Sequence, residues 1–547
     1  MDITEFINEL KELQPLAETD MVEKAHNLLK NALNDFSFLK KKKLYQEAVD
    51  LARRTLDENA QADFIAAALL FNLPDHDADL YKKIRDELNE KIELIVRSYH
   101  YSHQRLNGDK DDLLQHSFRT ALSLATIKTD AAAISAALLH EILFHTEISF
   151  DEVEKEFGAE VVGLIKNLDK IRSIKTAGNN QYVFHLREMV VAMAKDLRVV
   201  IIKMCSNIDR MKNPRAEQGE KIMPLALESR EILAPLADLL GIWQLRWQLE
   251  DLSFKILQPD EYDKIARRFD VDEKKNRDKY IQKTKNLLLK KAKEYNIDCQ
   301  VDGRFKHFYS IYAKMKDKKK NFDDIGDVFA LRVVVGNLDD CYRTLGIIHS
   351  LWKPKQRRIK DYIADPKSNK YQSLHTTVFG VNGRATEFQI RTKEMDEEAN
   401  YGISAHWYYK NPRKKVPAWI NDLLIEQQQY KDDQEFLNKF TSNLLDTRIY
   451  VYSPKGDVIS LPIGSTPLDF AYHVHTEIGH KCKEALVNDL RVPLNYELRT
   501  NDVVQIILDR SQPGPRREWL DFVKTHGAKK HIEDFLSRQP MERSFRL

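Results

Sequence analysis

Apolar residues recur every three or four positions through almost all of residues 1–245, and few glycines or prolines interrupt them. This spacing is that of amphipathic α-helices, so it predicts an all-helical N-terminal half. Within this half the run Ile65–Phe71 (IAAALLF) is echoed by Ile134–His140 (ISAALLH). Alanine-rich runs favour closely packed helices, and the echo is either a duplicated helical unit or a coincidence of two short runs.

The pattern changes in the second half of the chain. A loop from Phe322 leads into the β-branched run that ends at Val335, which predicts a buried strand. Residues 385–391 alternate apolar and polar residues, which predicts a strand whose solvent-facing side carries Glu387, Gln389 and Arg391. From residue 447 the chain is again rich in β-formers, and residues 448–462 predict a hairpin. With 547 residues, the chain is expected to form several domains of mixed α+β class.

The stretch Arg358–His375 gathers cations, amides, tyrosines and a histidine among Pro, Ser and Asn. Arg and Lys donate charge-assisted hydrogen bonds to phosphate oxygens, and Tyr371 offers a flat face to a purine. A solvated loop with ordinary lysines is the alternative, but the flanking segments carry similar chemistry. The stretch therefore predicts a pocket for a phosphorylated nucleotide.

Two flanking segments support this prediction. If residues 303–314 open a helix, Lys306, Ser310 and Lys314 are four residues apart and share one face. Asp327 and Glu387 are expected at strand edges beside the cationic pocket. Because Mg²⁺ prefers one or two carboxylates together with substrate phosphates, the two acids are candidate magnesium ligands.

Long runs within residues 303–410 resemble the synthetase domain of the RelA/SpoT family. They are GRFKHFYSIYAKM, DYIADPKSNKYQSLHTT and EFQIRTKEMDEEANYGISAHWYYK. The resemblance implies a Mg²⁺-dependent transfer of the β,γ-pyrophosphate of ATP to the ribose 3′-hydroxyl of GDP or GTP, which yields the alarmones ppGpp or pppGpp and releases AMP. Such chemistry depends on positioning and on neutralising phosphate charge.

The resemblance also assigns roles to residues. Asp327 and Glu387 are expected to be catalytic and to hold Mg²⁺. Tyr371 is expected to stack on guanine, with Arg304 and Arg332 near ATP. The full set of expected substrate-binding residues is Arg304, Lys306, Ser310, Lys314, Arg332, Arg358, Lys360, Asp361, Lys367, Asn369, Tyr371, Gln372, His375 and Gln389. One departure is Lys370, where the family commonly has Gly, and we expect the loop to accommodate it.

The helical half resembles the family's HD-type hydrolase domain, which binds Mn²⁺, but the metal motif is altered. His116 and His140 match two metal histidines. The paired Asp is Glu141, and the last metal Asp aligns with Ser206. We expect this site to be degenerate and inactive, without Mn²⁺. In the alternative, Glu141 is joined by His145 and Asp209 in a rebuilt metal site.

The segment Arg358-x-Lys360-Asp361 matches the RxKD sequence of bifunctional family members. Together with the altered metal motif it suggests descent from a bifunctional ancestor that lost hydrolysis. Three functions are therefore considered: an alarmone synthetase with an inactive hydrolase domain, an alarmone hydrolase or bifunctional enzyme, and a nucleotide sensor without catalysis that binds tRNA or the ribosome. Retention of both Asp327 and Glu387 argues against the sensor.

The run PLDFAYHVHTEIGHKC resembles a TGS domain, a small ubiquitin-like β-grasp module. In long family members it contacts uncharged tRNA on the ribosome, which makes His475 the candidate contact, with His473 and His480 as neighbours. The zinc-finger-like and ACT modules of long members are not expected after residue 547. The sequence predicts six parts. They are a helical region that is a possible degenerate repeat (1–97), an HD-type domain (98–250), a synthetase domain (251–410), a linker with a helix at 417–443 (411–445), a TGS domain (446–510) and a helical tail (511–547).

The composition of the chain also indicates its cellular compartment. The four cysteines are scattered without disulfide or CxxC spacing, the start lacks a secretion signal, and no run approaches the roughly 18 apolar residues of a membrane span. Lys and Arg number 86 against 84 acids, so the net charge argues neither for nor against a nucleic-acid partner, and we expect no membrane partner. We expect a cytoplasmic protein.

Overall fold

The structure is a computed structural model, and the chain forms two compact units. Unit 1 comprises residues 1–363 and 371–436, and unit 2 comprises residues 364–370 and 437–547. The structure describes residues 10, 19–32, 38–57, 60–71, 78–106, 108, 110–172, 179–214, 222–267, 271–304, 307–318, 329–356, 358–364, 366, 371–402, 448–454, 458–499, 502–509, 511 and 513–538. The helix predicted at 417–443 lies outside these residues.

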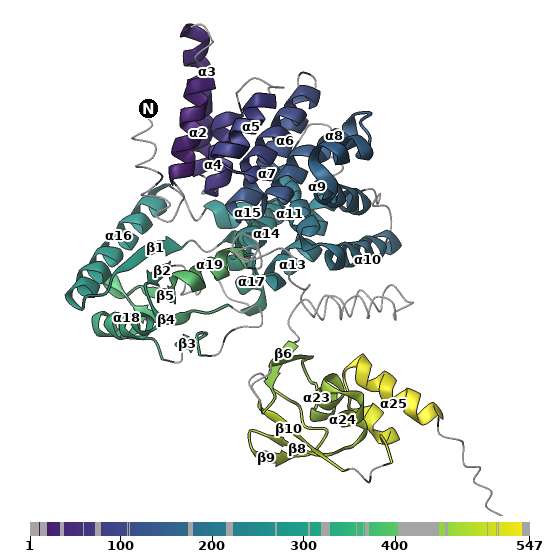
Figure 1. Cartoon of the computed structure of the whole chain (residues 1–547). Coiled ribbons are helices and arrows are strands. Elements are labelled where there is room, and N and C mark those ends of the chain that lie inside the picture. The colour runs from purple at the N-terminus through teal and green to yellow at the C-terminus, as the bar shows by residue number, and fades with distance from the viewer. Residues whose placement is uncertain are drawn as a thin grey trace, which may run out of the picture. The chain divides into compact units, whose positions relative to one another are not determined.

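Unit 1 begins with a long series of helices (Figure 1). Within the described part of residues 19–294 every element is helical, in agreement with the apolar spacing of the sequence. The elements are α2 (Thr19–Ala32), α3 (Phe38–Asp57), α4 (Ala62–Leu70), α5 (Ala78–Glu87), α6 (Glu90–Leu106), α7 (Asp111–Thr126), α8 (Ala131–His145), α9 (Phe150–Arg172), α10 (Asn179–Lys195), α11 (Leu197–Lys212), α12 (Ile222–Glu228), the π-helix η2 (Ser229–Leu233), α13 (Ala234–Leu239), α14 (Trp243–Leu257), α15 (Pro259–Ala266) and α16 (Val271–Glu294).

The two echoed runs form buried helices. Every residue of α4 is buried, and so are residues 131–142 of α8. Helix α4 packs against α2, α3 and α6, and α8 packs against α6, α7 and α9. A helix surrounded in this way is apolar on all sides rather than on one stripe, and its alanines let the neighbouring helices approach closely. The echo therefore marks two helices with the same packing role.

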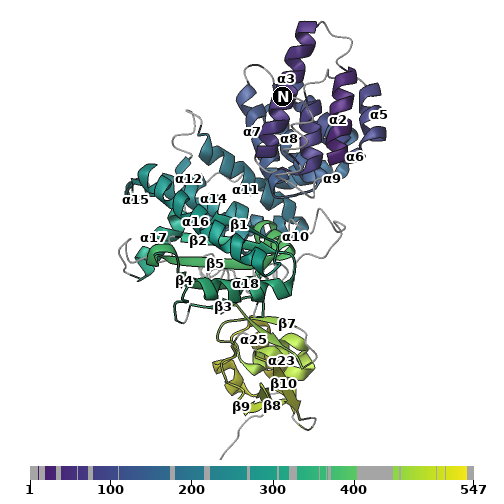
Figure 2. The same ribbon diagram turned by 90° about the vertical axis from the view of Figure 1, so that its left-hand side faces the viewer.

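A five-stranded mixed sheet follows the helices. Its order is β1-β2-β5-β4-β3, with β2 and β5 parallel and the other neighbours antiparallel. Helices α16 and α18 pack against the sheet (Figure 2). The elements are β1 (Cys299–Arg304), α17 (Phe308–Lys318), β2 (Phe329–Val335), α18 (Leu338–Leu351), β3 (Lys360–Asp361), β4 (Leu374–Phe379), the 3-10 turn η5 (Val381–Gly383), β5 (Ala385–Thr392) and α19 (Lys393–Tyr401).

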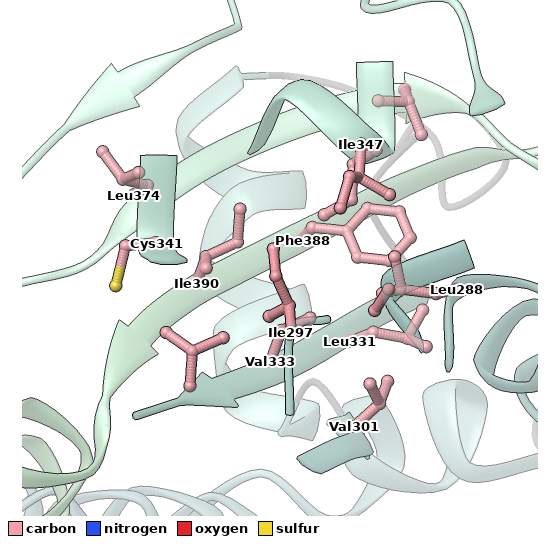
Figure 3. Packing of buried hydrophobic residues seen from close by; sticks show 14 of the residues in the cluster. Leu288, Ile297, Val301, Leu331, Val333, Cys341, Ile347, Leu374, Phe388 and Ile390 are labelled. Carbon is pink, nitrogen blue, oxygen red and sulfur yellow. The ribbon is translucent and has the colours of Figure 1, made fainter. Parts of the chain in front are cut away.

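The sheet has one apolar face. Alternate residues of its central strands, such as Leu331, Phe388 and Ile390, pack with Leu288 of α16 and Ile347 of α18 (Figure 3). Because side chains alternate across a strand, the residues between them point to the opposite face. That second face carries the polar residues of β2, β4 and β5.

Helix α14 runs without a break through residues 250 and 251, where the sequence predicted a domain boundary. Its second half joins α15 and α17 in one apolar cluster around Phe254 and Ile311. Asp251 also accepts hydrogen bonds from the backbone N–H groups of Tyr309 (2.9 Å) and Phe308 (3.3 Å), at the N-terminus of α17. The helix thus connects the helical half to the residues that precede the sheet, and apolar spacing alone does not reveal such a shared element.

The Asp251→Asn variant should gain stability relative to the parent as pH rises. Burial raises the pKa of Asp251 from 3.8 to about 6, although the hydrogen bonds from Tyr309 and Phe308 lower it. Between about pH 4 and 6 the folded state therefore keeps a proton that the unfolded chain has lost, and stability falls as pH rises. An asparagine has no such proton and still offers an acceptor.

Urea unfolding between pH 4 and 7 measures this difference. The free energy of unfolding of Asp251→Asn minus that of the parent should increase by up to about 3 kcal/mol over this range. The exposed Asp260, changed to Asn, is the control and should show no such trend. A difference between Asp251→Asn and the parent that does not change with pH would contradict the argument.

Unit 2 combines a hairpin, a three-stranded sheet and short helices. The hairpin predicted at 448–462 is formed by β6 and β7, and the sheet has the order β10-β8-β9. Residues of both sheets share one core with Phe470. The elements are β6 (Arg448–Tyr452), β7 (Val458–Pro462), α23 (Pro467–Val474), α24 (Thr476–His480), β8 (Cys482–Val487), β9 (Leu490–Val492), β10 (Val504–Leu508), the 3-10 helix η6 (Arg517–Asp521) and α25 (His526–Arg538).

The segment predicted as a separate tail packs onto the same unit. Trp519, Val523 and Ile532 share a buried cluster with Leu468 and Tyr472 of α23. The residues after 510 therefore complete a core that begins in the β-rich part. Among the described helices, none combines the length and apolar character needed to cross a membrane.

Candidate active site

One row of polar side chains crosses the second face of the sheet in unit 1. Strand pairing places Arg332 of β2 opposite Gln389 of β5, Gln389 opposite His375 of β4, and His375 opposite Lys360 of β3. On the other side Arg332 pairs with Asp302 of β1. Residues in register across neighbouring strands point to the same face, so all five strands contribute one residue to the row.

Glu387 lies beside this row, one alternation from Gln389 along β5. Its Oε1 accepts a hydrogen bond from Gln389 Nε2 at 2.9 Å and lies 3.3 Å from His375 Nδ1. The hydroxyl of Tyr371 and His375 Nε2 are 2.9 Å apart. These contacts link the predicted acid to the predicted guanine-stacking tyrosine through one histidine.

Two arginines on this face share a carboxylate. Asp396 Oδ1 on α19 lies 2.6 Å from Arg391 Nη2 and 3.3 Å from Arg332 Nη1. Arg391 and Gln389 are buried, and the side that we predicted to face solvent along residues 385–391 is therefore covered at these positions. The prediction was wrong there because alternation shows which residues share a face but does not show what covers that face.

The RxKD segment and its neighbours lie at the β3 edge of the sheet. Arg358 and Lys360 are exposed, and Lys360 Nζ lies 5.9 Å from the centre of the Tyr362 ring. Asp361 accepts hydrogen bonds from the Tyr342 hydroxyl and the backbone N–H of Ile363. Gln372 Nε2 donates to the backbone carbonyl of Ile363 at 3.3 Å.

Helix α17 begins at Phe308, later than the helix considered from the sequence. Ser310 and Lys314 lie on it four residues apart, and it packs against α14 and α15. The remaining predicted residues lie outside the described parts of the chain: Asp327, Lys306, Lys367, Asn369 and the Arg304 side chain, together with Lys370. The structure thus brings together Arg332, Lys360, Tyr371, His375, Glu387 and Gln389.

In the helical half, the residues of the altered metal motif form a compact buried cluster. One ligand atom from each of His116, His140 and Glu141 lies within 4.8 Å of the others, and among the described residues this is the group whose spacing is that of metal ligands. Ser206 Oγ is 3.0 Å from His116 Nε2, at the position where the alignment placed it. Helices α7, α8 and α11 supply these residues.

The two histidines are held in fixed orientations. His116 Nδ1 is 2.6 Å from the Asp209 carboxylate, and His140 Nδ1 is 2.6 Å from the carbonyl oxygen of Ala137. Both partners can only accept, so each Nδ1 carries a hydrogen, and His116 Nε2 accepts a hydrogen bond from Arg210 Nε. Burial lowers the pKa of His116 to about 4 despite the hydrogen bond to Asp209, so His116 is neutral at pH 7.

Three arginines surround the two acids of this cluster. Arg210 Nη2 donates to Glu141 Oε1 at 2.8 Å, and Arg172 Nη1 lies 3.5 Å from Glu141 Oε2. Arg119 donates to Asp209. Burial would raise the pKa of Glu141, but its histidine and arginine neighbours hold it well below its usual range. The acids are therefore ionised and already paired with cations.

A divalent ion does not fit this arrangement. Arg210 Nε is 3.4 Å from His116 Nε2 while its Nη2 contacts Glu141, so the guanidinium lies between two of the three donor groups. Asp209 contacts the opposite nitrogen of His116, which places it behind the histidine. His145 Nε2 lies 3.0 Å from Glu141 Oε2. The rebuilt ligand set of Glu141, His145 and Asp209 is therefore not assembled.

The sequence did not identify the arginines. Arg210 is four residues after Ser206, and Arg119 three after His116, so both spacings place an arginine on the face of the motif residue. Asp302 and Asp396 were also missed. Asp302 directly precedes Gly303, the first residue of the GRFKHFYSIYAKM motif, but a single acid at that position does not predict a functional residue.

In unit 2 the three histidines differ in exposure. His475 is exposed, and its Nδ1 accepts a hydrogen bond from the backbone N–H of Glu477 at the start of α24. His473 is also exposed. His480 is partly buried against Tyr472 and Phe535, and burial lowers its pKa. His475 and His473 are therefore accessible from solvent, whereas His480 packs within the unit.

Family profiles match three parts of the chain. The profile described as "Region found in RelA / SpoT proteins" matches residues 303–414, an HD domain profile matches 94–243, and a TGS domain profile matches 449–508. These ranges correspond to the sheet of unit 1, the helical cluster and the β-rich part of unit 2. They confirm the predicted combination of a helical HD-type half, a mixed α/β domain and a TGS domain.

Curated relatives cover most of the chain. A guanosine-3′,5′-bis(diphosphate) 3′-pyrophosphohydrolase of Aquifex aeolicus is 39% identical over 84% of this chain and 67% of its own length. A GTP pyrophosphokinase of Myxococcus xanthus is 38% identical over 83% of this chain and 62% of its own. The bifunctional (p)ppGpp synthase/hydrolase SpoT of Escherichia coli is 37% identical over 81% and 64%. The chain spans about two thirds of the length of these relatives.

Proposed function

The chain belongs to the RelA/SpoT family, and on this premise we propose that it transfers the β,γ-pyrophosphate of ATP to the 3′-hydroxyl of GDP or GTP. The observation that carries the proposal is the row from Lys360 through His375 and Gln389 to Arg332, with Glu387 beside it. It offers cations, a carboxylate and an aromatic ring on one face of a rigid sheet, which are the groups needed to position two nucleotides.

We assign Glu387 the central role in this reaction. Its carboxylate is a hard oxygen ligand on the polar face, and with Asp327 it would hold Mg²⁺, which would neutralise charge on the transferred phosphates. Its Oε1 contacts Gln389 Nε2 and His375 Nδ1, which hold the carboxylate on the polar face. The Glu387 carboxylate can also accept a hydrogen bond from the attacking 3′-hydroxyl.

The other residues of the row would bind the nucleotides. Arg332 would contact ATP while Asp396 holds its guanidinium in place. Tyr371 would stack on the guanine, and the contact of its hydroxyl with His375 would hold its ring in one orientation. Lys360 at the exposed β3 edge would meet phosphate charge. We also assign Arg304, Lys306, Ser310, Lys314, Arg358, Asp361, Lys367, Asn369 and Gln372 to substrate binding.

We further propose that the helical half does not hydrolyse alarmones. The arginine contacts of Glu141 and Asp209 support this, because the acids that would bind a metal ion are already neutralised by guanidinium groups. Hydrolysis remains the second candidate function. It is favoured by the relatives named as pyrophosphohydrolases and by the close approach of His116, His140 and Glu141.

For unit 2 we propose contact with tRNA on the ribosome through the TGS domain. The exposure of His475 at the start of α24 supports its assignment as a contact residue. A His475→Ala variant that binds uncharged tRNA as tightly as the parent would remove that assignment.

Chromatography of a reaction with ATP, GDP or GTP, and Mg²⁺ tests the synthetase. We expect AMP and the guanosine product to appear in equal amounts, because each transfer releases one AMP. AMP without a pyrophosphorylated guanosine product would contradict the proposal. Separately, purified ppGpp incubated with the protein and Mn²⁺ should release no pyrophosphate, and its release would support the second candidate.

A further inference from the structure

We propose that the guanidinium of Arg210 occupies the position of a divalent metal ion in the helical half. Removing this one side chain is therefore expected to create a metal site at His116, His140 and Glu141. The inference extends the proposed loss of hydrolysis and is independent of the synthetase. It gives a role to Arg210, a residue to which the family resemblance assigns none.

The donor atoms already have the arrangement of ligands. The Nε2 atoms of His116 and His140 lie 3.6 Å and 3.0 Å from Glu141 Oε1, while both Nδ1 atoms contact other acceptors. His140 is 2% exposed, and its Nε2 lies 3.0 Å from Glu141 Oε1. One ligand atom from each of His116, His140 and Glu141 lies within 4.8 Å of the others. A buried carboxylate in such a group is stabilised when a cation lies beside it.

Arg210 supplies that cation from α11. Its Nη2 is 2.8 Å from Glu141 Oε1, and its Nε is 3.4 Å from His116 Nε2. A metal ion bound at about 2.0–2.2 Å from the same atoms would lie against the guanidinium and be repelled by it. The arginine and the ion are therefore mutually exclusive occupants.

The ligand frame should persist when Arg210 is removed. The contacts of His116 with Asp209 and of His140 with the Ala137 carbonyl do not involve the arginine. His145 remains near Glu141 Oε2, which leaves Oε1 free for an ion. Outer partners of this kind orient metal ligands in proteins and set their affinity.

Titration with Co²⁺, followed by visible absorption, tests the inference on the full chain. Arg210→Ala should show one saturable ligand-field spectrum that the parent lacks, with Co²⁺ bound at least about tenfold more tightly than in the parent. The parent sets the baseline for other sites, including that of Glu387. Arg210→Lys keeps the positive charge and should behave as the parent does. The double variant Arg210→Ala/His140→Ala loses a ligand and should lose the new spectrum.

Two results would overturn the inference. One is a folded Arg210→Ala chain that binds no more Co²⁺ than the parent, and the other is a new spectrum that survives the loss of His140. Arg210→Gln, which also removes the positive charge and should bind Co²⁺ as Arg210→Ala does, provides a second variant. If both variants lose their helical circular dichroism in metal-free buffer, Co²⁺ or Mn²⁺ should restore it, and failure to do so equally refutes the inference.

Discussion

Replacing Glu387 by glutamine is expected to lower the rate of alarmone synthesis by about 10²-fold or more. The amide keeps the size of the side chain and an acceptor oxygen. It removes the negative charge that would hold Mg²⁺ and attract the proton of the attacking hydroxyl. Because Gln389 and His375 contact Glu387 through a single oxygen, the fold of the sheet should be retained. The rate is measured as AMP and product formed at saturating ATP.

The matched control is Glu394→Gln, the same change at an exposed position on α19. It should leave the rate unchanged. Asp327→Asn should lower the rate of synthesis as much as Glu387→Gln does, since the two acids are proposed to bind the same ion. Synthesis by Glu387→Gln at close to the parent rate would remove Glu387 from the mechanism, provided that circular dichroism shows an intact fold.

The second large effect is expected in unit 2, where replacing Asp469 by alanine should destabilise the fold by about 4 kcal/mol. Asp469 is fully buried. Its carboxylate accepts hydrogen bonds from Thr466 at the start of α23 and from the backbone N–H groups of Lys524 and Thr525 before α25. Alanine would leave the buried donors of Thr466 and the partly buried donors of Lys524 and Thr525 without this acceptor.

Thermal or urea unfolding followed by Trp519 fluorescence measures this effect, because Trp519 is buried in the same cluster. Asp534→Ala, an exposed change on α25, is the control and should alter stability little. The stability of Asp469→Asn should lie between those of Asp469→Ala and Asp534→Ala. If Asp469→Ala is as stable as the parent, the segment after residue 510 is not held to the domain through this carboxylate.

Periodicity predicted the elements whose environment is simple. The helical half, the strand ending at Val335 and the strand over 385–391 all followed from apolar spacing, because burial on one face imposes that spacing directly. The covering of Arg391 did not follow, since it depends on Asp396 of the next helix. The continuation of α14 across the predicted domain boundary was not predicted for a similar reason. A helix that packs in two environments shows no change in the spacing of its apolar residues.

The family motifs located the candidate sites but not their internal contacts. The motifs brought Glu387, His375 and Tyr371 together, as the sheet does. The altered metal motif was visible as substitutions at Glu141 and Ser206, but Arg210, which we propose takes the place of the metal ion, was not predicted. Its contact could not be predicted from the motif, because the arginine reaches Glu141 from another helix.

The central claim is that the chain synthesises alarmone and does not degrade it. The most direct measurement is one time course in which ATP, GDP and Mg²⁺ are converted, ATP is then removed enzymatically, Mn²⁺ is added, and ppGpp is quantified by chromatography. We predict that ppGpp rises together with AMP and then remains constant after ATP is gone. Failure to form ppGpp would contradict the synthetase assignment, and decay of ppGpp to GDP and pyrophosphate after Mn²⁺ addition would contradict the loss of hydrolysis.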